Sequence, residues 1–506
     1  MQRKVLLCVL AAASLVAAAP KKPKLVVAIV VDQFRYDYLT RFRSDYKAGL
    51  DRLLTHGAVF TNANYEHFPT VTAVGHSTFL SGATPALSGI IGNDWYDRQE
   101  GREVTSVSDS KTQLVGGRGG AGSSPDRMLV STIGDELKIA DQGRSKVIGI
   151  SLKDRSAILP AGHMANGAYW FDNATGNFVS STFYFADVPP WVKAFNDSRP
   201  AAHYAGAIWL GHTMPADPKQ LNAALAASPF GNELVEAFAE RALEAEDLGK
   251  HDFTDVLAVS FSSNDYVGHE VGPDAAEVRE MSERTDQVLG RLFETVERAV
   301  GLDNVLVVLT ADHGVAPLPE VNATRRMPGG RPPAGIVNKT AQEALVQKYG
   351  DGKWIVSSSE HSLYFNRTLI AERKLDRAEV NRTAAEAIRG IPHVFRVYTF
   401  EQLMNGAVTA DAISRRVTNG FYASRSGDVE ILLEPYWIFT QRGATHGTAF
   451  DYDTHVPVIF MGPGIRSGRY YGSITPNDIA PTLATMLDVE TPSGSAGRVL
   501  SEMFAE

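Results

Sequence analysis

Six acidic and imidazole side chains occur close to the ends of apolar runs in the chain. Three of the segments that carry them, VVD, FSSNDYVGH and TADHG, end or follow such a run, and RGATHGT precedes another. One such acid could cap a helix and one such histidine could simply be packed, but their common placement indicates a shared site. The six residues are Asp32, Asp265, His269, Asp312, His313 and His446.

These ligand types point to metal ions. Carboxylate oxygens and imidazole nitrogens without sulfur suit zinc best, with manganese or iron as alternatives. Six ligands are enough for two divalent ions with three protein ligands each, which leaves an open position on each ion. Two-metal sites of this kind usually serve phosphoryl transfer, because the ions stabilise both the attacking and the leaving oxygen.

A nucleophile for such a reaction could come from HFPTVTAVGHSTFLSG, residues 67–82. Before its closing Ser-Gly this stretch carries four hydroxyl side chains: Thr70, Thr72, Ser77 and Thr78. A free alcohol is a poor nucleophile at neutral pH, whereas coordination to a metal ion lowers its pKa, as it lowers that of bound water. The residue types alone leave open which of the four hydroxyls is activated.

The apolar runs are typical of strands buried on both faces. They occupy 24–32, 145–152, 253–261, 304–312 and 456–464, and segments with helical periodicity, the first over about 36–56, separate them. This alternation predicts an α/β fold with a doubly wound, mostly parallel sheet. In such sheets the working site lies outside the carboxyl ends of the strands, where five of the six candidate ligands fall.

Two regions interrupt the alternation. Residues 94–240 are rich in Gly, Ser, Pro and aromatic residues, and residues 318–435 carry a small α/β pattern of their own between two core-like segments. We expect both regions to be inserted caps over the site, within one catalytic domain that spans residues 20–506.

The first segment, MQRKVLLCVLAAASLVAAAP, has the charged, apolar and small-residue parts of a secretory signal peptide. We therefore expect residues 1–19 to be removed and the mature chain to be periplasmic or secreted, without a membrane span. Cys8 is the one cysteine of the chain. A mature protein without it would contain neither thiols nor disulfides and would depend on its core for stability.

The composition argues against some partners. Hydrophobic residues make up 44% and charged residues 21% of the 506 residues, as in an ordinary globular protein. Loss of Arg3 and Lys4 with the signal peptide would change the formal charge from −9 to −11. A net acidic chain without a basic run argues against nucleic acid as a partner and leaves small molecules as the expected substrates.

Several motifs in order resemble the alkaline phosphatase superfamily, and within it the bacterial threonine-nucleophile alkaline phosphatases of the nucleotide pyrophosphatase/phosphodiesterase-like branch. They are VVAIVVDQFRYDYL, PTVTAVGHSTFLSG, IGNDWYDR, SLKDRSAI, NDYVGH, TADHG, ATHGT and HVPVIFMGPGI. The resemblance implies an alkaline phosphatase-like fold and two zinc ions per chain. In this branch the nucleophilic threonine lies four residues before a Gly-His histidine, which points to Thr72 ahead of His76 and leaves Thr70 to shape the turn.

The resemblance also implies a role for each site residue. One ion would be held by Asp32, Thr72, Asp312 and His313, and the other by Asp265, His269 and His446. Asn93, Lys153 and Arg155 would contact the phosphoryl group, with the two basic residues in place of a third metal ion. Because Lys153 and Arg155 alternate, we expect them to point the same way along an extended segment. Thr72 would attack phosphorus, and water would hydrolyse the resulting phosphothreonine.

Two other functions remain open. A phosphodiesterase or nucleotide pyrophosphatase would use the same two metals and the same threonine, but would need an apolar patch for its second substituent. An exported protein that only binds zinc or phosphate would also keep the ligands. A sulfatase is disfavoured, because that reaction needs an oxidised Cys or Ser where this chain has Thr72.

Overall fold

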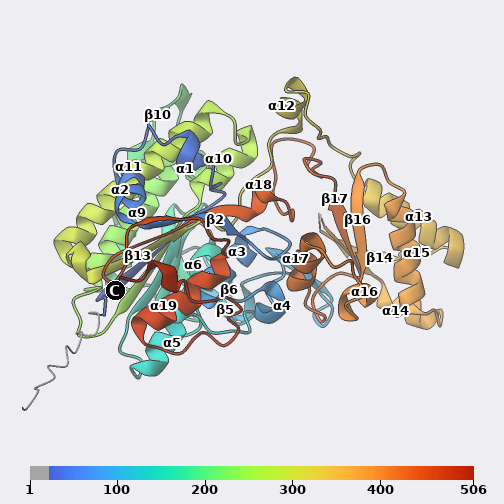
Figure 1. The fold of residues 1–506 in the computed structure, drawn as a ribbon, viewed down its shortest axis with the longest axis horizontal. Helices are drawn as coiled ribbons and strands as arrows, with labels where there is room; N and C mark the ends of the chain where they lie inside the picture. Colours follow the sequence, from blue (N-terminus) through green and yellow to red (C-terminus); the bar gives the residue numbers. More distant parts are fainter. Residues whose placement is uncertain (1–21, 360, 506) are drawn as a thin grey trace, which may run out of the picture.

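The computed structural model describes residues 22–359 and 361–505, so the predicted signal peptide lies outside the described residues. An 11-stranded sheet crosses the larger of two lobes (Figure 1). In spatial order its strands are β19 (Gly468–Tyr470), β2 (Ala58–Asn64), β18 (His455–Met461), β13 (Val305–Thr310), β1 (Leu25–Val31), β12 (Asp255–Phe261), β7 (Val147–Ser151), β8 (Gly167–Asp172), β9 (Asn177–Ser181), β5 (Ser108–Val115) and β6 (Ala121–Ser123).

The centre of this sheet is parallel. Strands β13, β1, β12, β7 and β8 pair in parallel, and β18 and β9 flank them as antiparallel neighbours. Every residue of β1, LVVAIVV, is buried, because helices cover both faces of the sheet there. The predicted α/β fold with a large, mostly parallel sheet is therefore confirmed.

Alternate side chains of β1 enter two separate cores. Leu25, Val27 and Ile29 pack on one face, and Val26 and Ala28 pack on the other. The first face is covered by α2 (Gly49–His56), α9 (Pro229–Ala245) and α11 (Ala276–Ala299). The second is covered by α3 (Thr72–Ser81), α5 (Ile133–Ala140), α6 (Asp154–Ala161) and α19 (Ile479–Leu487).

The helical segment expected over residues 36–56 is divided in two. It forms α1 (Tyr38–Arg41) and α2, with a turn between them. The carboxylate of Asp286, which comes from α11, accepts the backbone N–H groups around the start of α2. An acid contributed from a distant helix thus caps α2, and no local sequence signal could predict that break.

The structure corrects the expectation that residues 94–240 form an inserted cap. Strands β7, β8 and β9 lie in this range and belong to the main sheet, where β7, α6 and β8 make a βαβ unit beside β12. Only two short pairs of strands in this range are separate from the main sheet. They are the hairpins β3–β4 (Asp94–Asp97 and Arg102–Thr105) and β10–β11 (Ile208–Trp209 and His212–Thr213).

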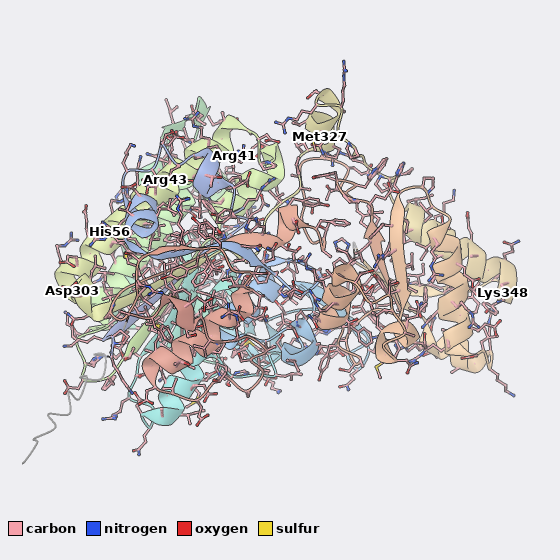
Figure 2. All side chains as sticks on the ribbon, in the orientation of Figure 1. Arg41, Arg43, His56, Asp303, Met327 and Lys348 are labelled. Atoms are coloured by element: carbon pink, nitrogen blue, oxygen red, sulfur yellow. The ribbon has the colours of Figure 1, made fainter. Side chains whose placement is uncertain are left out.

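Residues within 318–435 form the smaller lobe, on the right in Figure 1. Its sheet has the order β14 (Ile355–Ser358), β15 (Ser362–Phe365), β17 (Val429–Leu433) and β16 (Val394–Thr399), all antiparallel. Helices α13 (Ile336–Tyr349) and α15 (Arg377–Arg389) pack on it around the buried Trp354. Figure 2 labels Lys348 at the outer side of this lobe and Asp303 at the far side of the larger one.

The remaining helices are short connections. They are α4 (Pro85–Ser88), α7 (Pro190–Asp197), α8 (Pro218–Ala226), α10 (Ser263–Val271), α12 (Pro319–Thr324), α14 (Arg367–Glu372), α16 (Phe400–Met404), α17 (Ala412–Gly420) and α18 (Asp451–Thr454). In the part of the chain that the structure describes, none of the helices combines the length and the apolar character needed to span a bilayer.

Candidate active site

The structure brings the six predicted ligands together in two groups of three. Asp32 directly follows β1, and Asp312 and His313 follow the neighbouring parallel strand β13. These three residues form the first group. Within each group the candidate ligand atoms all lie within 4.8 Å of one another. The second group consists of Asp265, His269 and His446.

The three imidazoles are oriented by the backbone. Nδ1 of each ring lies 2.8–2.9 Å from a carbonyl oxygen, in the pairs His269 with Ala444, His313 with Gly314, and His446 with Thr70. An N–H donor at Nδ1 leaves Nε2 with a free lone pair. Nε2 of His269 faces Asp265 Oδ1 at 3.2 Å, and Nε2 of His313 faces Asp312 Oδ2 at 3.3 Å. Metal-binding histidines are held in this way.

The first group fits a divalent cation. Asp32 Oδ1, Asp312 Oδ2 and His313 Nε2 are buried and have no hydrogen-bond partner among the described residues. Burial and the neighbouring Asp32 raise the pKa of Asp312 well above its usual range, while burial lowers the pKa of His313 to about 3. Unpartnered buried polar atoms are costly, and a cation bound between them would satisfy all three. Carboxylates and imidazoles without sulfur suit zinc.

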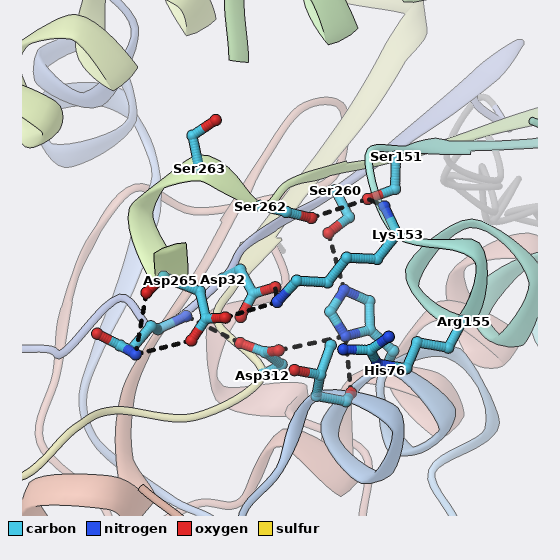
Figure 3. Close-up of polar contacts among 12 residues, drawn as sticks. Asp32, His76, Ser151, Lys153, Arg155, Ser260, Ser262, Ser263, Asp265 and Asp312 are labelled. Atoms are coloured by element: carbon cyan, nitrogen blue, oxygen red, sulfur yellow. Dashed lines mark hydrogen bonds and ion pairs between the residues drawn. The ribbon is translucent and has the colours of Figure 1, made fainter. Parts of the chain in front are cut away.

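Lys153 links the two groups. Its Nζ lies 2.7 Å from Asp32 Oδ2 and 2.6 Å from Asp265 Oδ2, one carboxylate from each group (Figure 3). Burial disfavours the ammonium ion, but Asp265 and Asp32 outweigh it and raise the pKa of Lys153 above its usual value. The side chain therefore stays charged, and two of its three N–H donors are engaged.

Arg155 lies on a helix and not on an extended segment, which corrects the expected alternation with Lys153. Lys153 is the N-cap of α6, whose first residue is Asp154, so Arg155 belongs to the first helical turn. An acid at this position favours a helix start, because it interacts with the positive end of the helix dipole. In Figure 3 the side chain of Lys153 runs from this helix end toward Asp32 and Asp265, and that of Arg155 runs toward His76.

The four hydroxyls of the 67–82 stretch differ in their hydrogen bonds. Those of Thr70, Ser77 and Thr78 each donate to a backbone carbonyl, of Thr448, Val74 and Ala83 respectively. Thr72 is buried at the first position of α3, and within the described part of the chain no hydrogen bond engages its hydroxyl. Three of the candidate hydroxyls are thus engaged by backbone carbonyls, which leaves Thr72 as the candidate nucleophile.

The start of α3 is held against the first ligand group. A Cβ atom at Gly75 would lie 2.3 Å from the carbonyl oxygen of Asp312, so only glycine allows this approach. Nδ1 of His76 lies 2.8 Å from the Thr72 carbonyl and 3.3 Å from Asp312 Oδ2, while Nε2 lies 2.8 Å from Ser260 Oγ (Figure 3). The sequence motif marked His76 only by its spacing from Thr72. In the structure His76 holds the start of α3 in place beside Asp312.

Asn93 has a fixed amide orientation. Its Oδ1 accepts the backbone N–H of Ala73, the second residue of α3, at 2.8 Å. Nδ2 is therefore the group that remains available, and Asn93 lines a cavity of about 320 Å³ that also reaches His269 and His446. An amide donor beside a helix N-terminus suits an anion, because the unpaired N–H groups and the dipole there favour negative charge.

Gln33 is a residue of the site that the sequence did not suggest. Its backbone N–H donates to Asp312 Oδ1 at 3.0 Å, and its Nε2 donates to Asp265 Oδ1 at 2.7 Å, so it contacts both ligand groups. It has a left-handed φ of 57°, and a Cβ atom at Gly268 would lie 1.8 Å from its Oε1. The sequence offered one signal for Gln33, which is its position directly after Asp32. Gln33 belongs to no periodic pattern of residues.

Comparison with known proteins agrees with this geometry. The family model for type I phosphodiesterases and nucleotide pyrophosphatases matches residues 26–455. The alkaline phosphatase PafA of Elizabethkingia meningoseptica is 35% identical, with 96% of this chain and 95% of that protein aligned. The alkaline phosphatase PhoV of Synechococcus elongatus is 37% identical, over 96% and 93%.

A solved structure extends the similarity to the fold. The crystal structure of wild-type PafA superposes with a TM-score of 0.89 at 34% identity, covering 96% of this chain and 99% of that one. The predicted family is thereby confirmed. The chain belongs to the type I phosphodiesterase and nucleotide pyrophosphatase family, with alkaline phosphatases among its full-length relatives.

Proposed function

We propose that the chain is an alkaline phosphatase that hydrolyses phosphate monoesters through a phosphothreonine at Thr72, with two zinc ions, after export from the cytoplasm. The observation that carries the proposal is a set of three donors, Asn93, Lys153 and Arg155, gathered around the start of α3 beside the two ligand groups. Relatives that are themselves alkaline phosphatases and align over nearly the whole chain support it.

The reaction would proceed in two steps on residues of the chain. The Thr72 oxygen attacks phosphorus, and the bond between phosphorus and the alcohol oxygen breaks in line with it. Water then cleaves the phosphothreonine, which restores Thr72 and releases phosphate. Zinc ions in the two groups would supply Lewis acidity, which makes the threonine hydroxyl more acidic and stabilises negative charge on the oxygens.

The three donors would hold the transferred phosphoryl group. The third N–H of Lys153, the guanidinium of Arg155 and Nδ2 of Asn93 can each donate to a non-bridging oxygen. These oxygens carry two negative charges in a monoester and one in a diester. A site with two cationic side chains and a helix N-terminus therefore stabilises the monoester more strongly.

The second candidate is a phosphodiesterase, and two observations favour it. The matching family model is that of phosphodiesterases and pyrophosphatases, and the cavity next to the ligands has apolar lining residues such as Phe68, Ile91 and Phe421. Rates for an aryl phosphate and a matched aryl methyl phosphate, measured side by side, separate the two functions. A faster monoester supports the phosphatase, and a faster diester would replace it.

Metal content tests the cofactor and distinguishes an enzyme from an inactive binding protein. We expect two zinc ions per chain by elemental analysis of an active preparation, and loss of most activity in His446→Ala. One ion or none in a fully active sample would contradict the two-zinc centre. Two ions in a protein that hydrolyses neither ester would support the binding protein.

A further inference from the structure

The cavity of about 320 Å³ lies between the two lobes, on the side of the second ligand group. His269, His446 and Asn93 line it, and so do Tyr364 and Glu430 of the smaller lobe. A monoester whose phosphate lies at the ligand groups would therefore extend its alcohol part into this cavity. Selection of that alcohol by the cavity presupposes the proposed phosphatase function.

The charges that line the cavity are acidic. Glu430 and Asp94 line it, and no lysine or arginine does so among the described residues. Nearby arginines have other partners. Arg98 pairs with Asp428 at 3.2 Å, and Arg155 belongs to the phosphate side of the site. An alcohol that carries its own negative charge would be repelled here, and a cationic one would be attracted.

Glu430 is held in place for such a role. It lies on β17 with 9% of its surface exposed, and it accepts hydrogen bonds from Ser362 Oγ and from the Gly427 N–H. Burial raises its pKa to about 7, so the carboxylate is charged at alkaline pH. Both hydrogen-bonding partners belong to the smaller lobe, and the charge is therefore fixed relative to the cavity.

Further lining groups suit a cation with apolar substituents. Phe68 and Phe421 are among the residues that line the cavity, and aromatic rings attract ammonium groups. His361 also lines it, and both of its ring nitrogens are buried without a hydrogen-bond partner in the described residues. An amino alcohol could use the carboxylate and the aromatic residues for its ammonium group.

We propose that this cavity is a leaving-group pocket that selects phosphate monoesters of cationic amino alcohols over those of anionic alcohols. The negative charge of Glu430 determines this preference. Hydrolysis breaks the bond between phosphorus and the alcohol oxygen, and the amino alcohol leaves with a proton supplied by water. Neutral alcohols enter the same pocket without the electrostatic gain.

Three esters and two variants test this at pH 9. The esters are choline phosphate, its uncharged isostere 3,3-dimethylbutyl phosphate, and the carboxylated 3-phosphonooxypropionate. Glu430→Gln should lower kcat/KM for choline phosphate relative to the isostere by about 10-fold, equivalent to about 1.4 kcal/mol. It should raise the relative kcat/KM of the carboxylated ester. Glu434→Gln is the matched control, because this acid is 47% exposed and pairs with His393 outside the cavity.

Comparison of ratios keeps differences in intrinsic reactivity out of the result. Equal changes for all three esters in Glu430→Gln would overturn the pocket while leaving the phosphatase function intact. Hydrolysis of none of them by the wild-type enzyme would instead contradict the phosphatase itself. If Glu430→Gln does not fold, product inhibition of the wild-type enzyme gives the same answer. Choline should then inhibit more strongly than 3,3-dimethylbutanol, and equal inhibition would refute the proposal.

Discussion

Arg155→Ala should separate monoester from diester hydrolysis more cleanly than any other change in the site. The guanidinium has few internal partners: its side chain is 26% exposed, its closest acid is Asp154 at 3.8 Å, and its Nε is buried without a hydrogen-bond partner. A partly exposed ion pair of this kind is worth about 1 kcal/mol at most. Removal of Arg155 should therefore leave the fold intact.

The expected loss depends on the bond that Arg155 would make to the phosphoryl group. A charge-assisted hydrogen bond contributes about 1.5–3 kcal/mol, which corresponds to roughly a 10- to 150-fold loss in kcat/KM for an aryl monoester. A matched methyl diester has one negative charge fewer on the transferred group, so its loss should be smaller. Lys153→Ala is less informative, because that ammonium also bridges Asp32 and Asp265.

The assay is kcat/KM for both esters in wild type, Arg155→Ala and a control variant, with thermal unfolding followed in parallel. Arg144→Ala serves as the control, since this exposed arginine precedes β7 at the opposite end from Arg155. Equal losses for the two esters with an unchanged unfolding temperature would refute a role on the phosphoryl group. The phosphodiesterase would then become the better explanation.

Four further outcomes are expected. Thr72→Ala should abolish the labelled phosphoenzyme trapped by acid quench, whereas Thr70→Ala should retain it; label on Thr70 in the wild type would contradict the assignment. Gln33→Ala should weaken zinc binding at the second ligand group about 10-fold in chelator competition, because its side-chain amide donates to Asp265 Oδ1 while the backbone N–H to Asp312 is kept, and unchanged affinity would exclude this role. Burial raises the pKa of Glu236 to about 7, so its ionisation between its unfolded pKa and pH 7 costs the folded state stability. Glu236→Gln should therefore gain about 2–3 kcal/mol in unfolding free energy over wild type between pH 4.5 and pH 8, and a pH-independent difference would show that the shift is absent. N-terminal sequencing of protein purified from cells should find a start near residues 19–22, and an intact Met1 would contradict export.

The candidate metal ligands were predictable because they depend on local sequence and one rule of topology. Each run of β-branched residues indicates a buried strand, and parallel strands bring their carboxyl ends to one edge. Asp32 and Asp312 therefore had to lie close together once β1 and β13 were neighbours. The same reasoning predicted the α/β fold, although it could not predict that β18 runs antiparallel to β13.

The roles of the basic residues were less predictable, because they depend on where a helix begins. A turn of one residue more or less after β7 would rotate Arg155 by about 100° around the axis of α6. The sequence suggested an extended segment there, and the structure has a helix that starts at Asp154. Likewise, the assignment of residues 94–240 to a cap failed because β8 and β9, unlike β7, are not apolar runs of β-branched residues and so gave weak sequence signals.

Contacts between distant segments were decided by the tertiary structure alone. Gln33 reaches Asp265 across 232 residues of sequence, and Glu430, on a strand of the smaller lobe, lines the cavity beside the ligand groups. Neither residue belongs to a repeating pattern, since such positions depend on the packing of two elements and not on the periodicity of one. The sequence thus determined the elements and the candidate metal-binding groups, while packing between them determined which side chains orient these candidate ligands and which line the cavity beside them.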